Sequence, residues 1–151
     1  MSIRVEHLTH IYDKGLPTEQ IALEDINFTV EDGELLGVIG HTGSGKSTLL
    51  QHLNGLLKPS SGRVLVGDVD ITAPGVSMVE IRKRIGLVFQ YPASQLLEEP
   101  VAKAVAFGPN HRGLSEQEIA ARVREAQDMV GLDSHHIHTH SPFQLSGGHK
   151  H

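Results

Sequence analysis

The 151-residue sequence contains no cysteine, which excludes disulfide bonds and thiol chemistry and fits a reducing cytosol. Basic residues are outnumbered, since 13 Lys and Arg stand against 18 Asp and Glu, for a net charge of -5. This balance argues against a nucleic-acid partner, because nucleic-acid-binding domains favour a basic face. Long apolar runs are missing too. The stretch 85–97 is interrupted by Gln90, Tyr91 and Pro92, so it cannot span a bilayer.

The most informative segment is the run GHTGSGKS from Gly40 to Ser47. It matches GxxxxGK followed by Ser or Thr, the phosphate-binding loop, which arises by accident in roughly one chain of this length in 200. Its glycines let successive backbone N–H groups turn toward phosphate oxygens. The Lys46 ammonium group reaches the β- and γ-phosphates in such loops, and the Ser47 hydroxyl ligates Mg²⁺.

The flanks of this loop predict a strand and a helix. The apolar run 35–39 before it indicates a buried parallel strand. After it, leucines at helical spacing predict a helix over 48–53, and Gly55 marks its end.

Further elements are predicted on both sides of this unit. A strand opens the chain at Ile3, a second covers 26–30, and a hairpin joins 63–66 to 69–71 through Gly67 and Asp68. The apolar run 85–89 predicts another core strand.

Helices are expected beyond Pro92. The clearest begins at Ser115, which forms a capping box with Glu118, and it ends at Gly131. Its expected apolar face consists of Ile119, Val123, Ala126 and Val130.

Three further features complete a constellation around the loop. Tyr12 lies upstream, Gln90 follows the run 85–89, and Leu145–His149 reads LSGGH. Taken together, their order and spacing resemble the nucleotide-binding domains of ABC transporters, whose signature is LSGGQ. The resemblance extends to the ATPase subunits of energy-coupling factor (ECF) transporters. It rests on the segments 39–49, 51–59, 86–92, 106–109 and 141–143.

The resemblance implies an α/β fold, namely a P-loop NTPase core of the ABC ATPase type. The core is expected to be incomplete and to carry an N-terminal antiparallel β subdomain and a helical subdomain. Residues 1–151 would form a single ATP-binding domain. Its β subdomain and P-loop core would cover about 1–91, and its helical subdomain and signature about 92–148.

It also implies roles for individual residues. Tyr12 would stack on adenine. Gln90 would contact both Mg²⁺ and the attacking water. Gln90 and Lys46 are the catalytic candidates. Ser47 and Gln90 are the candidate Mg²⁺ ligands. The expected ATP-binding residues are Tyr12, Gly40, His41, Thr42, Gly43, Ser44, Gly45, Lys46, Ser47, Thr48, Ser146, Gly147 and Gly148.

Simpler alternatives stay open for some of these residues. A tyrosine can fill a surface groove, Gln90 can be an ordinary loop amide, and Ser146 to Gly148 can form a glycine turn. The histidines at 135, 136, 138 and 140 suggest a metal site, but a solvated loop explains them better.

The function implied is that of an ATP-binding subunit of an ECF-type importer, an ABC transport ATPase coupled to uptake of vitamins or transition-metal ions. Its partners would be a second ABC ATPase subunit in a head-to-tail dimer, a membrane-embedded coupling subunit and a substrate-binding membrane subunit that selects the solute. No nucleic acid is expected. The subunit would lie peripherally on the cytoplasmic face of the cell membrane.

The family continues beyond its signature with a strand that ends in Asp, then a Glu, and later a His. None of these lies within residues 1–151, and His149 replaces the usual Gln. We therefore expect this chain to bind ATP without hydrolysing it, and the edge of 35–39 to be left unpaired. Alternatives are a non-catalytic nucleotide-binding module or inactive remnant, and a soluble ABC ATPase of translation or DNA repair. The helices expected beyond Pro92 disfavour the soluble ABC ATPase.

Overall fold

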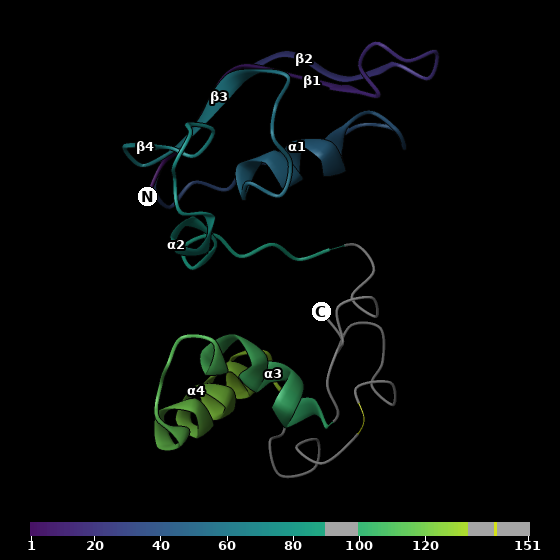
Figure 1. Cartoon of the computed structure of the whole chain (residues 1–151). Helices are drawn as coiled ribbons and strands as arrows, with labels where there is room; N and C mark the ends of the chain where they lie inside the picture. Colours follow the sequence, from purple (N-terminus) through teal and green to yellow (C-terminus); the bar gives the residue numbers. More distant parts are fainter. Residues whose placement is uncertain (90–99, 133–140, 142–151) are drawn as a thin grey trace. The chain divides into compact units, whose positions relative to one another are not determined.

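A computed structural model of the chain describes residues 1–89, 100–132 and 141 (Figure 1). The chain divides into two compact units, Met1–Leu87 and Val88–His151. The first unit carries a sheet with two helices, and the second carries two further helices. Each unit is described by itself.

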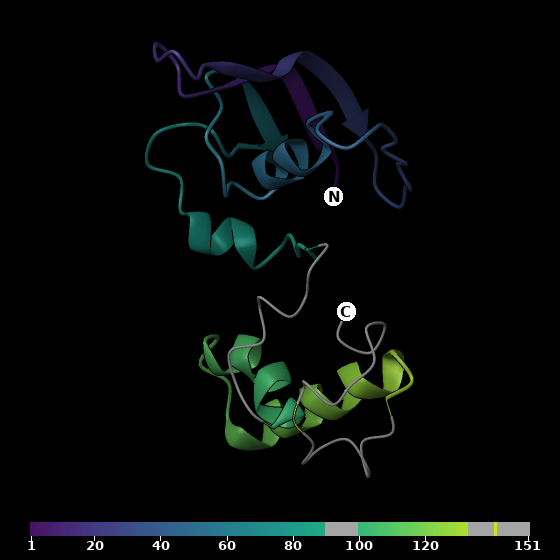
Figure 2. The ribbon, with the colours of Figure 1, turned by 90° about the vertical axis from the view of Figure 1, so that its right-hand side faces the viewer.

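The first unit is built on a four-stranded antiparallel sheet of order β2-β1-β3-β4. Figure 2 shows α1 lying against one face of this sheet. The elements in chain order are β1 (Ile3–Tyr12), β2 (Gln20–Val30), α1 (Lys46–Leu53), β3 (Ser61–Val66), β4 (Val69–Asp70) and α2 (Met78–Arg82). The predicted opening strand, second strand, hairpin and loop helix are therefore confirmed.

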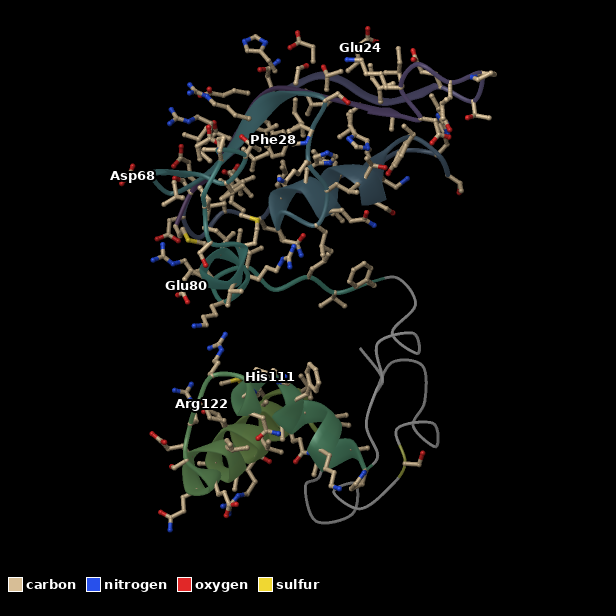
Figure 3. All side chains as sticks on the ribbon, viewed as in Figure 1. Glu24, Phe28, Asp68, Glu80, His111 and Arg122 are labelled. Atoms are coloured by element: carbon tan, nitrogen blue, oxygen red, sulfur yellow. The ribbon has the colours of Figure 1, made fainter. Side chains whose placement is uncertain are left out.

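The core of this unit lies between the sheet and the two helices. On β2, Phe28 is directed toward α1 and Glu24 away from it (Figure 3). Residues four apart lie on one face of a regular strand, so β2 changes phase between them, where its pairing with β1 shifts register. The buried apolar residues that pack together are Val5, Leu8, Leu23, Leu49, Val64, Val66, Ile71 and Ile81.

Within β1, the alternation of buried and exposed side chains changes phase at His7. Val5 and Leu8 are both buried although they are three residues apart, because a β-bulge shifts the register between them. A one-residue change of phase turns every later side chain to the opposite face of a sheet. The bulge therefore brings His10 and Tyr12 to the face that carries α1.

Both neighbouring strands support this bulge. On β2, Asn27 Oδ1 accepts a hydrogen bond of 2.7 Å from the His7 N–H, and Asp25 Oδ1 lies 2.7 Å from His7 Nδ1. On β3, Gly62 has a φ of 83°, and a Cβ atom there would overlap the carbonyl group of His7. The bulge therefore requires a residue without a side chain opposite it.

The second unit contains α3 (Val101–Asn110) and α4 (Glu116–Met129), which pack against each other. The capping box predicted at the start of α4 is confirmed. Ser115 Oγ accepts from the Glu118 N–H, and the Ser115 N–H donates to Glu118 Oε2 at 2.9 Å.

The face of α4 that is buried differs from the expected one. Val123 is buried, but Ala126 is exposed and Val130 is 67% exposed. The buried position in the following turn is Gln127, which is 1% exposed. An apolar pattern assigns burial by residue type, whereas packing in the folded chain assigns it by position.

The two strands predicted at 35–39 and 85–89 are wrong. Neither segment pairs with a strand within the described part of the chain, and several of their apolar side chains are exposed, although Ile85 packs against the core. Leu35 is 96% exposed, Ile39 95% and Val88 69%. A run of apolar residues favours burial, but a strand also needs a hydrogen-bonding neighbour, and residues 1–89, 100–132 and 141 provide none for these segments.

Substitution of Gly62 tests the support of the bulge. Gly62→Ala is expected to lower the free energy of unfolding by about 2–5 kcal/mol, since a left-handed residue gains a Cβ atom that meets the His7 carbonyl. Gly86→Ala is the matched control, because a Cβ atom there meets nothing within 4 Å. Equal urea midpoints for the two variants would show that the bulge tolerates a side chain opposite it.

Candidate functional site

The segment between β2 and α1 curls into a loop at the start of α1. Gly43 and Gly45 have φ values of 84° and 90°, which side chains disfavour. Gly45 also packs against β2, where an added Cβ atom would lie 2.5 Å from the carbonyl oxygen of Ala22. These glycines therefore serve both the curvature of the loop and its close approach to the sheet.

Lys46, the first residue of α1, folds back over this loop. Its Nζ atom donates to the carbonyl oxygens of Gly40 and His41 at 2.8 Å each, and to Ser44 Oγ at 3.3 Å. At Gly40 an added Cβ atom would lie 2.6 Å from Ser44 Oγ, so a side chain there would displace the Ser44 hydroxyl. An ammonium group is thus held at the centre of a glycine-lined curl that opens a helix.

Tyr12 reaches the same helix from the end of β1. Its hydroxyl lies 3.1 Å from Thr48 Oγ1, within hydrogen-bond distance, and its side chain remains 38% exposed. An aromatic ring that is partly exposed beside such a glycine-lined curl can offer one face to a planar ligand. The bulge in β1 is what places the ring there.

A comparison with protein-family models decides the family. The model described as ABC transporter matches residues 23–151. The chain belongs to the ABC transporter family.

Curated relatives agree with this ABC transporter assignment. The energy-coupling factor transporter ATP-binding protein EcfA2 of Clostridium tetani is 55% identical over 99% of this chain. The protein of the same name from Enterococcus faecalis is 47% identical over 98%. The chain spans about half the length of these relatives, 52% in each case.

Solved ABC cassettes share its fold. CbiO1 from Clostridium perfringens, part of the ABC transporter complex CbiONQ, has a TM-score of 0.82 at 38% identity. The alignment covers 98% of this chain and 57% of CbiO1. A dimeric ATP-binding cassette with bound ADP and phosphate also has a TM-score of 0.82, at 28% identity, over 98% of this chain and 65% of its own. The predicted α/β fold of the ABC ATPase type is thus confirmed.

The sequence-predicted site residues of this ABC transporter chain fall into two groups. The structure brings together Tyr12, Thr48 and the loop from Gly40 to Ser47. Gln90 and the signature residues Ser146, Gly147 and Gly148 lie outside the described residues.

The histidines at 135, 136, 138 and 140 also lie outside the described residues. In the described ranges, no cluster of three or more His, Asp or Glu side chains is arranged to hold a metal ion. Within those same ranges, no helix has the length and apolar character needed to cross a membrane.

Sequence reasoning alone did not single out two residues that adjoin the site. His10 and His52 are buried beside Tyr12 and Thr48, with 9% and 1% of their surfaces exposed. Their sequence spacing from Thr48 and Tyr12 could have indicated that they lie beside the site. His52 follows Thr48 by four residues, one helical turn, and His10 precedes Tyr12 by two residues, which places both on one side of a strand.

Burial lowers the pKa of His52 below its ordinary value of 6.5. A hydrogen bond to the Thr48 carbonyl opposes this effect, nearby His10 adds to it, and the Lys58 backbone opposes it again. Folding thus favours neutral His52, and the unfolded chain binds the proton more readily. The stability of the fold is therefore insensitive to this group well above pH 6.5 and decreases as the pH falls through 6.5 toward the lowered pKa.

This linkage predicts how stability depends on pH. From about pH 7.5 to about pH 5, the unmodified chain is expected to lose more free energy of unfolding than His52→Gln, whose amide does not titrate. The measurement is urea unfolding at a series of pH values. His41→Gln, which removes an exposed histidine from the same unit, should follow the unmodified chain. Parallel curves for His52→Gln and the unmodified chain would contradict the assignment of a neutral His52.

Proposed function

We propose that this chain is the N-terminal part of an ATP-binding subunit of an ECF-type ABC importer. The observation that carries the proposal is the position of Lys46, whose ammonium group lies at the centre of the glycine-lined loop at the start of α1. Family membership and the names of the curated relatives support the same assignment.

The loop has the chemistry that a triphosphate requires. Its carbonyl groups hold Lys46 by two hydrogen bonds of 2.8 Å, and phosphate oxygens would offer that ammonium group stronger, charge-assisted acceptors. The first N–H groups of α1 have no partner within the helix, and the helix dipole favours an anion there. Gly40, Gly43 and Gly45 leave the backbone accessible from the inside of the curl.

The remaining site residues would complete the nucleotide site. Tyr12 would stack on the base, and the loop residues and Thr48 would bind the phosphates. Ser47 and Gln90 would hold Mg²⁺, which neutralises phosphate charge when bound. Ser146, Gly147 and Gly148 would cap the γ-phosphate bound by a second ATPase subunit.

The biological role proposed follows from the relatives. A head-to-tail dimer with a second ABC ATPase subunit would couple ATP binding and hydrolysis to a membrane-embedded subunit. A separate membrane protein would select the vitamin or transition-metal ion. The protein would then lie peripherally on the cytoplasmic face of the membrane. The alternative is a nucleotide-binding module without turnover.

Nucleotide affinity tests the loop assignment. Lys46→Ala is expected to weaken Mg·ATP binding by about 10- to 100-fold, because hydrogen bonds to a charged group contribute about 1.5–3 kcal/mol. Isothermal titration calorimetry measures the change. Lys103→Ala, which removes the same charge from α3, is expected to bind like the unmodified chain. Unchanged affinity in Lys46→Ala would refute the phosphate-loop assignment.

Turnover tests the second part of the proposal. The 151-residue chain is expected to release phosphate from saturating Mg·ATP no faster than buffer alone, since it lacks the carboxylates that polarise the attacking water. A phosphate-release assay decides, with Lys46→Ala as the control for contaminating ATPases. Sustained release that Lys46→Ala abolishes would place a catalytic base within these residues.

A further inference from the structure

Two buried histidines connect β1 to α1 beneath the exposed ring of Tyr12. His52 Nε2 lies 3.2 Å from His10 Nδ1, and the two imidazole ring centres are 4.6 Å apart. His52 is 1% exposed and His10 9%. Two imidazoles bury more polar surface than an apolar pair of similar size would, so their presence calls for a specific role.

The hydrogen bonds of this pair have a defined direction. The Thr48 carbonyl oxygen, 2.7 Å from His52 Nδ1, can only accept, so His52 Nδ1 carries the proton. In a neutral imidazole the other nitrogen is then an acceptor. With His52 neutral, its Nε2 atom accepts from the Nδ1–H group of His10. In that arrangement the chain of donors runs from His10 through His52 to Thr48, and both rings are Nδ1–H tautomers.

Tyr12 closes this chain into a cycle. Its ring lies 4.5 Å from the His10 ring, centre to centre, with the planes at 84°, an edge-to-face contact. Its hydroxyl lies 3.1 Å from Thr48 Oγ1. Thr48 is thus connected to Tyr12 in two ways. Its side chain lies within hydrogen-bond distance of the Tyr12 hydroxyl, and its carbonyl group is bonded to His52, which contacts His10 beside the Tyr12 ring.

We propose that the His10–His52 pair positions Tyr12 against the first turns of α1 and thereby sets the affinity for the nucleoside part of the ligand. This inference rests on the proposed function, in which Tyr12 stacks on the base of ATP. His10 and His52 touch neither base nor phosphate in this role. They act through the ring that they hold.

Two ligands separate this role from general packing. Mg·ATP would use both Tyr12 and the loop, whereas inorganic tripolyphosphate with Mg²⁺ would use the loop alone. His52→Leu removes the acceptor for His10 and is expected to weaken Mg·ATP about fivefold, toward the lower end of what loss of a stacking platform costs. The affinity for tripolyphosphate is expected to stay within about twofold of the unmodified value. Calorimetry measures both.

Matched variants sharpen the comparison. His52→Gln retains a carbonyl oxygen near the position of Nε2 and is expected to restore most of the ATP affinity. Val64→Ala removes buried volume elsewhere in the same core, so it reports what loss of stability alone does to both ligands. In a Tyr12→Ala background, His52→Leu should have no further effect, because the two residues act through one contact. If His52→Leu does not fold, His10→Leu, which removes the donor to His52, replaces it with the same expectations.

Three results would overturn the proposal: an unchanged ATP affinity in His52→Leu, an equal loss for ATP and tripolyphosphate, or additive effects of His52→Leu and Tyr12→Ala. A nucleotide-free measurement keeps the test independent of the proposed function. NMR spectra of the imidazole nitrogens should show Nδ1–H for both rings. The ring signals of Tyr12 should shift in His52→Leu and return in His52→Gln.

If the unmodified chain bound neither ligand, the proposed function would fail, and these spectra would still decide the positioning role. Tyr12 signals that do not move in His52→Leu would then refute it.

Discussion

The bulge at His7 is the constraint on which the arrangement of the site depends. Without it, the alternation that buries Val5 would direct His10 and Tyr12 away from α1. With it, the end of β1 presents an aromatic ring to the helix that follows the phosphate loop. The bulge persists because β2 provides hydrogen bonds to it and β3 provides a glycine opposite it. Three strands are thus needed to direct one side chain.

The site on the first unit combines a charged centre with a rigid surround. Lys46 is held by carbonyl groups of its own loop, while Tyr12 is held by Thr48 and by the histidine pair. Binding of a phosphate group would exchange the carbonyl partners of Lys46 for charged ones without rebuilding the surround. Such pre-organisation reduces the entropy lost on binding. It suits a subunit that binds and releases nucleotide repeatedly in a transport cycle, as proposed for this ABC transporter chain.

Much of the fold was predictable because its signals are local. Glycine spacing identified the phosphate loop, leucine spacing predicted α1, and a capping box located the start of α4. The strands at 35–39 and 85–89 could not be predicted correctly from their apolar residues, because strand formation depends on a pairing neighbour and not on residue type alone. The buried face of α4 was also predicted wrongly, since folding buries Gln127 in place of Ala126.

The sequence by itself determined the chemistry of the site, because a backbone cradle with a lysine and a hydroxyl depends on residues that lie within eight positions of one another. Tertiary structure alone decided what surrounds that cradle. The side of the sheet on which Tyr12 lies is set by a bulge, and the His10–His52 contact forms only where β1 meets α1. Those residues are 42 positions apart, and only folding brings their imidazoles within hydrogen-bond distance.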